Sequence, residues 1–176
     1  SLRDQHPIVR AARAPIRCTA GQHWVWDGVR FDMLHPTAAS HDDPTLKPNA
    51  RSCTLRISNG RRTLLAAADI EAAQESQLLG RAASLLPADV LLAPHHGSGT
   101  SSTAAFLHMV RPSLAVFQVG YRNRYRHPKQ EVWDRYGEAG IARLRTDQAG
   151  AVTLDFGNEV QASSYRSTHL RYWYPN

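Results

Sequence analysis

Residues 63–98, TLLAAADIEAAQESQLLGRAASLLPADVLLAPHHGS, contain the pattern that decides the fold. Residues 63–68 and 89–94 are short apolar runs without polar alternation, which is typical of strands covered on both faces. Between them, residues 70–86 have the composition of a helix, with a break expected at Gly80. A strand, a helix and a second strand in this order predict an α/β sheet covered by helices.

The same alternation continues toward the carboxyl terminus. Ser101 and Ser102 are expected to cap a helix over residues 103–110. A third apolar strand follows at 114–120. The remaining predicted elements are a loop at 121–128, a helix at 129–140, and closing strands at 142–146 and 151–156.

Two β-hairpins are predicted upstream of residue 63. Asp27-Gly28 and Asn59-Gly60 each separate two short apolar runs. Both dipeptides favour the two-residue type I′ turn, because that turn needs two residues with positive φ. Residues 35–49 are rich in Pro, Asp and Ser and predict a loop, and a short helix is expected around residues 8–14.

The charge of the chain favours polyanionic partners. The 176 residues include 21 Lys plus Arg and 15 Asp plus Glu, which gives a net charge of +6. All the basic residues except Lys47 and Lys129 are arginine, whose guanidinium binds phosphate through two hydrogen bonds. High-GC coding would produce the same arginine bias. No run approaches the ~18 apolar residues of a membrane span, and a chain that begins at Ser1 without a signal peptide suggests a fragment.

The two cysteines leave two interpretations open. Cys18 and Cys53 are compatible with one disulfide, but two buried free thiols are the favoured interpretation, with Cys53 and Trp24 in the core. The chain has no C-x-x-C motif, which excludes a cysteine zinc site.

Polar side chains follow the apolar strands where each strand ends. Asp69 comes after the first strand, His95 and His96 after the second, and His127 follows the third. Because the carboxyl ends of parallel strands share one edge, these side chains are expected together, and imidazole with carboxylate suits Zn²⁺ or Mn²⁺. From the residues alone, the N-cap of the following helix is the favoured interpretation of Asp69 and a metal ligand is the alternative. The histidine pair is equally compatible with one ring that caps the sheet and one that faces water.

Two nearby segments predict contacts with nucleic acid. Ser98 and Ser101 lie in a Ser/Thr-rich stretch before a helix, where hydroxyl and amide groups form a natural phosphate site. The loop at 121–128 alternates arginine with aromatic residues, as in surfaces that bind phosphates and stack on bases. Its candidate DNA-binding residues are Arg122, Asn123, Arg124, Tyr125, Arg126 and His127. A solvated loop is the alternative. Serine-hydrolase elbow and P-loop motifs are absent from the sequence.

Three longer segments resemble a known family. APHHGSGTSS (93–102), RPSLAVFQVGYRNRYRHP (111–128) and RTDQAGAV (145–152) resemble the C-terminal metallo-β-lactamase-like domain of the ComEC family of DNA-internalisation competence proteins. The resemblance covers about residues 6–156, and the combination of segments is more specific than any one of them.

The resemblance implies a fold and a set of site residues. The implied fold is a metallo-β-lactamase-like αββα sandwich, present mainly as its C-terminal portion in residues 1–160, with an Arg/aromatic tail at 161–176. Asp69, His95 and His96 are the implied metal ligands and catalytic residues. One of the two histidines is expected to bind the metal, with a small preference for His95, and the loop at 121–128 is expected at the rim of the active site.

The resemblance also implies a setting for the domain. ComEC proteins lie in the bacterial inner (plasma) membrane, and the lactamase-like domain is expected on its periplasmic side as a nuclease that degrades the DNA strand not taken up. The implied partners are single-stranded DNA, bound without sequence preference, and the channel and other domains of the parent protein. This segment is not expected to insert into the membrane.

Departures from the family pattern qualify the expected activity. The H-x-H-x-D-H signature of metallo-β-lactamases is absent from the sequence, and Ala68 and Arg126 stand where the family usually has glycine. Mn or Zn is therefore expected to bind only with upstream ligands, and the fragment alone is expected to be inactive. The alternatives are a catalytically silent DNA-binding or structural module, and a lactamase-fold hydrolase that acts on a small molecule.

Overall fold

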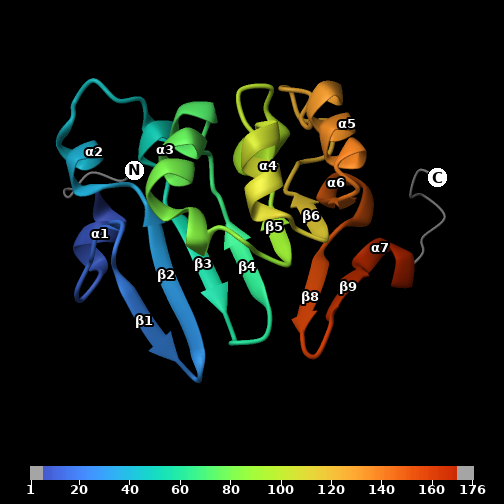
Figure 1. Ribbon diagram of the computed structural model, residues 1–176, viewed down its shortest axis with the longest axis horizontal. Helices are drawn as coiled ribbons and strands as arrows, with labels where there is room; N and C mark the ends of the chain where they lie inside the picture. The colour runs from blue at the N-terminus through green and yellow to red at the C-terminus, as the bar shows by residue number, and fades with distance from the viewer. Residues whose placement is uncertain (1–5, 170–176) are drawn as a thin grey trace.

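The computed structural model describes residues 6–169. Within this range, seven strands form one sheet in the order β1 to β7, and two form a separate small sheet (Figure 1). Neighbours from β1 to β4 are antiparallel, and neighbours from β4 to β7 are parallel. The strands are β1 (His23–Trp26), β2 (Val29–His35), β3 (Thr54–Ser58), β4 (Thr63–Ala66), β5 (Val90–Leu92), β6 (Leu114–Phe117), β7 (Ala142–Arg145), β8 (Val152–Phe156) and β9 (Val160–Ser164).

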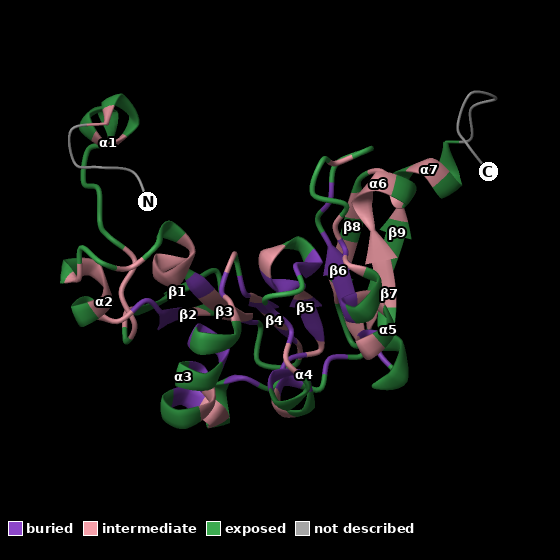
Figure 2. Ribbon diagram, turned by 90° about the horizontal axis from the view of Figure 1, so that it is seen from above, coloured by how far each residue is buried: buried purple, intermediate pink, exposed green. Residues whose placement is uncertain are grey.

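The helices lie between these strands and confirm the predicted α/β class. They are α1 (Pro7–Ala11), α2 (Ala38–Asp42), α3 (Ala72–Ala82), α4 (Ala104–Val110), α5 (Gln130–Glu138), α6 (Thr146–Ala149) and α7 (Tyr165–Thr168), with 3-10 turns η1 (Pro48–Arg51), η2 (Ala83–Leu85) and η3 (Pro94–Gly97). Figure 2 shows α3 and α4 on the same side of the row of strands. In residues 6–169, every helix is too short or too polar to cross a bilayer.

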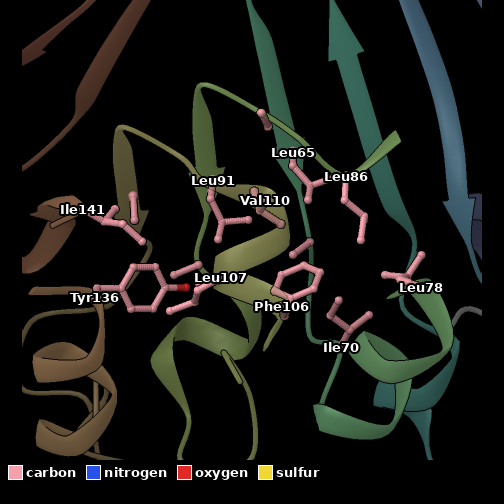
Figure 3. Close-up of a cluster of buried hydrophobic side chains, with 14 of the residues drawn as sticks. Leu65, Ile70, Leu78, Leu86, Leu91, Phe106, Leu107, Val110, Tyr136 and Ile141 are labelled. Carbon is pink, nitrogen blue, oxygen red and sulfur yellow. The ribbon is translucent and has the colours of Figure 1, made fainter. Parts of the chain in front are cut away.

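The hydrophobic core fills the space between the sheet and the helices. Leu65 of β4 and Leu91 of β5 are fully buried against Phe106 of α4 and Tyr136 of α5 (Figure 3). Alternate residues of each strand point to the same face, so the odd-numbered positions of β4 and β5 face the helices. Each large side chain buried in this way stabilises the fold by about 1.5–3 kcal/mol relative to its exposed state.

The opposite face of the sheet is also apolar but only partly covered. Cross-strand pairing places one row of side chains on this face: Trp24, Phe31, Ile57, Leu64, Val90, Leu114 and Ala142. Val90 is fully buried, whereas Trp24 at the edge of the sheet is 43% exposed. The prediction of a core Trp24 is therefore wrong. Its ring instead stacks on Phe31, with centroids 5.0 Å apart.

Both predicted hairpins form, but only one of them has the predicted turn. Asp27 and Gly28 both have positive φ, at 53° and 76°, as a type I′ turn requires. Asn59 and Gly60 instead belong to a four-residue connection, because Ser58 pairs with Thr63. The side chain of Asn59 accepts hydrogen bonds from the N–H groups of residues 61 and 62, which stabilises the longer turn.

Several predicted boundaries differ from the structure. Gly80 lies inside α3 and does not break it; the helix changes to a 3-10 turn only at residue 83. The expected loop at 35–49 contains α2 and the start of η1. The predicted tail at 161–176 begins inside β9, which pairs with β8 through Val160 opposite Phe156, and residues 170–176 lie outside the described range.

The cysteines form a disulfide, so the preferred interpretation as two buried thiols is wrong. Cys18 and Cys53 are bonded, with Cα atoms 6.0 Å apart and a separation of 35 positions in sequence. Cys53 is exposed and does not belong to the core. Closing a loop of this length stabilises a fold by about 3–4 kcal/mol in the chain-entropy description.

A buried carboxylate organises the start of α4. Glu75 is fully buried and accepts hydrogen bonds from the N–H groups of Ser102 and Thr103, at 2.5 and 2.8 Å. Burial raises the pKa of Glu75, while these hydrogen bonds act in the opposite direction. The helix is capped by the hydroxyl of Thr103 and not by Ser101 or Ser102 as predicted, because Thr103 Oγ1 accepts from Phe106 N–H.

We expect Glu75→Ala to destabilise the protein by about 2–4 kcal/mol, because the buried N–H of Ser102 and the partly buried N–H of Thr103 would lose their acceptor. Urea unfolding at neutral pH measures this change. The matched control is Glu138→Ala, at an exposed position of α5, which should shift stability by less than about 0.5 kcal/mol. Equal effects of the two substitutions would contradict the assigned role of Glu75.

Candidate metal and nucleic-acid site

The loops that carry the candidate residues leave the same edge of the sheet. β4, β5 and β6 are parallel, so the residues after each strand meet at their carboxyl ends. Asp69 follows β4, and His95 and His96 lie in η3 after β5. A hydrogen bond of 2.9 Å from the N–H of His95 to the carbonyl of Ala68 joins these two loops. The structure thus brings Asp69 and both histidines together.

His96 is the histidine that faces Asp69. Its Nε2 lies 3.4 Å from Asp69 Oδ1, and both side chains are about half exposed, at 49% and 42%. Its Nδ1 lies 2.7 Å from the carbonyl oxygen of Gln118. Because a carbonyl only accepts, Nδ1 carries the hydrogen, and Nε2 of the neutral ring presents a lone pair toward the carboxylate. Metal-binding histidines are oriented in this way by a carbonyl behind the ring.

Asp69 is not the N-cap of the following helix. The N-cap of α3 is Glu71, which forms a capping box with Gln74. That alternative is therefore wrong, and the Asp69 carboxylate remains available at the sheet edge. Ala68, just before it, has a left-handed φ of 54°.

His95 belongs to a second polar cluster beside the first. Its Nδ1 lies 3.4 Å from Glu71 Oε1 and 3.4 Å from Thr100 Oγ1. Its Nε2 lies 3.3 Å from Asn49 Nδ2, which also donates to Glu71 Oε1 at 3.2 Å. Asn49 and Glu71 are the site residues that sequence reasoning missed. Asn49 is 46 residues from His95, and the sequence pattern assigned neither Asn49 nor Glu71 a role in the site. The capping box of Glu71 with Gln74 is the local signal that could have drawn attention to Glu71.

The described residues do not form a complete metal site by themselves. Across residues 6–169, no group of three or more His, Cys, Asp or Glu side chains is arranged to hold a metal ion. Asp69 and His96 form a pair of ligand types suited to Zn²⁺ or Mn²⁺, and zinc takes about four ligands. The pair therefore fits such an ion only if further ligands come from outside these residues.

His127 lies next to His95 at the rim of the site. The two rings are stacked with centroids 5.9 Å apart, and Tyr125 lies 5.8 Å beyond His127. Nδ1 of His127 is buried without a hydrogen-bond partner. Burial is the main cause that lowers the pKa of His127, followed by the charge of Lys129. Asn123 holds the loop by accepting from His127 N–H and donating to its carbonyl, at 2.8 and 2.9 Å.

The arginines of this loop are exposed and lie beside aromatic rings. Arg122 lies 5.1 Å from the ring centroid of Tyr121, and Arg124 lies 4.7 Å from that of Tyr125. Arg122 and Arg126 have left-handed backbone, with φ of 52° and 55°. The loop therefore presents positive charge and ring faces to solvent next to His127.

The predicted phosphate site at Ser98 and Ser101 is not open to a ligand. Both residues are buried, and Ser101 Oγ donates to the carbonyl of Pro94 at 2.9 Å. The amides at the start of α4 already bind the carboxylate of Glu75. An anion from outside would have to displace this internal carboxylate, so we do not include the two serines in the site.

The connection after β5 has an unusual backbone conformation. His95 and His96 both have left-handed φ, at 47° and 57°, and Gly97 follows at 82°. A side chain at Gly97 would meet Pro128 Cβ at 2.6 Å, so the close approach of η3 to the 121–128 loop requires glycine. Left-handed residues other than glycine cost about 1–2 kcal/mol each, and such strain is concentrated at functional sites.

Comparison with known proteins identifies the relatives of this chain. No protein-family model matches it. Competence protein ComA of Neisseria gonorrhoeae is 38% identical over 157 residues, covering 89% of this chain and 22% of ComA. Uncharacterized protein YcaI of Escherichia coli K12 is 33% identical over 158 residues, covering 89% and 20% respectively. Recombination protein 2 of Haemophilus influenzae Rd is 32% identical over 157 residues, covering 89% and 19%.

The chain is therefore a domain related to competence and recombination proteins. The chain belongs to the ComEC family, as its sequence motifs predict. It spans about a fifth of the length of these relatives.

The left-handed conformation of Ala68 generates a stability prediction. We expect Ala68→Gly to stabilise the protein by about 1 kcal/mol, because glycine adopts positive φ without the Cβ clash. The matched control is Ala66→Gly in β4, where glycine should destabilise by about 0.5–1 kcal/mol. Thermal unfolding of both variants measures the two effects, and destabilisation by Ala68→Gly would contradict the strained geometry.

Proposed function

We propose that this chain is the DNA-binding part of a metal-dependent nuclease domain in a DNA-uptake protein. The observation that carries the proposal is the Asp69–His96 pair, which lies at the same sheet edge as the Arg/Tyr loop. The competence and recombination names of the relatives support a role in natural transformation.

Asp69 and His96 are proposed to hold a Mn²⁺ or Zn²⁺ ion together with ligands from outside the described residues. Such an ion supplies Lewis acidity toward a phosphodiester. The carbonyl of Gln118 fixes the ring of His96 so that Nε2 points toward Asp69, and the backbone of Ala68 fixes His95 beside it. His95 is proposed to border the reacting phosphate and not to bind the metal, because its two nitrogens face Asn49 and Glu71.

The loop at 121–128 is proposed to bind a single DNA strand. Arg122, Arg124 and Arg126 are exposed and would bind phosphates, while Tyr121 and Tyr125 are 59% and 58% exposed and would stack on bases. A duplex hides the faces of its bases, whereas a single strand leaves them free, so exposed rings favour single-stranded DNA. None of these contacts reads a base edge, so binding is proposed to be independent of sequence.

The partly covered face of the sheet supports a metallo-β-lactamase-like fold. This apolar face runs from Phe31 and Ile57 on to Leu64 of β4 and Leu114 of β6, and parallel strands such as β4 to β7 are normally covered on both sides. We propose that it is the inner face of a metallo-β-lactamase-like αββα sandwich, whose second sheet comes largely from the rest of the protein.

The disulfide supports a location on the periplasmic side of the inner membrane. Cys18–Cys53 would persist in an oxidising compartment and would be reduced in the cytosol. We propose that the channel and the other domains of the parent protein hold the domain there.

A catalytically silent DNA-binding module is the second candidate. It is favoured by the lack of a third metal-ligand side chain in residues 6–169 and by the absence of H-x-H-x-D-H from the sequence.

Cleavage by the full-length protein separates the two candidates. We expect Mn²⁺-dependent hydrolysis of single-stranded DNA that is lost on adding EDTA and falls at least ~100-fold in Asp69→Asn and His96→Gln. Asp155→Asn, at an exposed position of β8, should retain full activity. DNA binding without cleavage favours the silent module, and cleavage unchanged by Asp69→Asn contradicts the proposed metal site.

The salt dependence of DNA binding tests whether the arginines of the loop at 121–128 contact phosphates. Replacing Arg122, Arg124 and Arg126 together by Gln should reduce the slope of log K against log salt by about 2, since each phosphate contact on a single strand contributes about 0.7. Arg111→Gln, at an exposed position after α4, is the control and should leave the slope unchanged. Fluorescence anisotropy with an oligothymidylate measures both variants, and equal slopes would contradict the assigned surface.

A further inference from the structure

The segment 48–53 carries Asn49, which contacts the site, and Cys53, which forms the disulfide. It contains η1 and leads into β3. Near its start, Asn49 contacts Glu71 and His95, and at its end Cys53 is bonded to Cys18. The same short segment therefore joins the disulfide to the His95 cluster.

The Asn49 amide determines which nitrogen of His95 carries hydrogen. Nδ2 has two hydrogens and faces two acceptors, Glu71 Oε1 at 3.2 Å and His95 Nε2 at 3.3 Å. When Nε2 accepts, the hydrogen of the neutral ring lies on Nδ1, which faces Glu71 Oε1 and Thr100 Oγ1. Asn49 thus fixes both the tautomer and the orientation of the ring.

The position of Asn49 depends on how the segment is anchored. The N–H of Ser52 donates to the carbonyl of Asn49 at 3.0 Å, and the carbonyl of Ser52 accepts from His35 Nδ1 at 2.8 Å. The covalent anchor is Cys53, which is bonded to Cys18. The carbonyl of Cys18 in turn accepts a hydrogen bond from His41 Nε2 at 2.7 Å. Besides the His35 contact, Arg51 Nη2 donates to the carbonyl of Asp43 at 2.5 Å, and Thr54 pairs with His35 where β3 begins. The disulfide adds a covalent cross-link to these non-covalent contacts.

We propose that Asn49 is a positioning residue for His95 and that the Cys18–Cys53 disulfide holds Asn49 in place. The site is then fully assembled only in the oxidised protein. Reduction by a dithiol transfers two electrons and two protons to the disulfide, which gives two cysteine thiols and the cyclic disulfide of the reductant. The relevance of this arrangement to DNA cleavage rests on the proposed function, but the structural coupling does not.

The test follows the His95 ring in the 176-residue chain by two-bond ¹H–¹⁵N NMR at pH 8, where an unperturbed imidazole is neutral. The variants are Asn49→Ala, Cys18→Ser with Cys53→Ser, and all three together, each compared at a temperature where circular dichroism shows it folded. Asn158→Ala, in the β8–β9 turn, is the matched control.

We expect Asn49→Ala to move the His95 nitrogen signals from the Nδ1–H form toward a mixture of tautomers. The double cysteine variant and wild-type protein in dithiothreitol should show the same shift, and the triple variant should show no further change. Unmoved His95 signals in Asn49→Ala would overturn the role of Asn49. Additive shifts, or a cysteine variant with wild-type signals, would overturn the coupling to the disulfide.

The DNA experiments above are independent of this result. If the His95 signals shift in Asn49→Ala and in the double cysteine variant, but the protein neither binds nor cleaves DNA, the proposed function is contradicted and the positioning role of Asn49 stands. If the protein cleaves DNA but the His95 signals do not shift in Asn49→Ala, the positioning role is contradicted and the proposed function stands.

Discussion

The parallel pairing of β4, β5 and β6 is the constraint on which the site depends. Because these strands run in the same direction, the loops that follow them reach one edge of the sheet together. Asp69 and the histidine pair could not meet if β4 or β5 were reversed. The pairing is stabilised from the helical side by Leu65, Leu91 and Phe117, which pack on α4 and α5, so the hydrophobic core and the candidate site have a common origin.

The site combines rigid and strained parts. Buried strands hold the ends of the loops, while Ala68, His95 and His96 adopt left-handed backbone just beyond them. The hydrogen bond between His95 N–H and the Ala68 carbonyl joins the two strained loops. Ala68 and Arg126 both occupy positions where glycine would be free of this cost. At Arg126 the side chain adds positive charge to the loop that faces solvent, which gives a physical reason for accepting the strain.

Sequence patterns predicted the features that depend on local chemistry. The alternation of apolar strands and helices and the Asp27-Gly28 turn follow from residues close in the chain. The convergence of Asp69 with the two histidines follows from the shared edge at which parallel strands end. The features that were missed depend on contacts over long separations. Neither Asn49 beside His95 nor Glu75 at the start of α4 has a local signal, because their partners lie 46 and 27 residues away. The disulfide was missed for a similar reason, since two cysteines in one chain do not show whether their Cα atoms lie within bonding range.

The two ends of the sheet have separate roles. The loops that carry Asp69, the two histidines and the three arginines leave the carboxyl ends of β4, β5 and β6, whereas the Asp27-Gly28 turn closes a hairpin at the opposite end (Figure 1). The tip of this hairpin is exposed, and strand pairing places it at the end of the sheet opposite the loops that carry Asp69 and His96. A fluorophore, a spin label or a surface tether could therefore be attached there without placing a probe at the proposed DNA-binding surface.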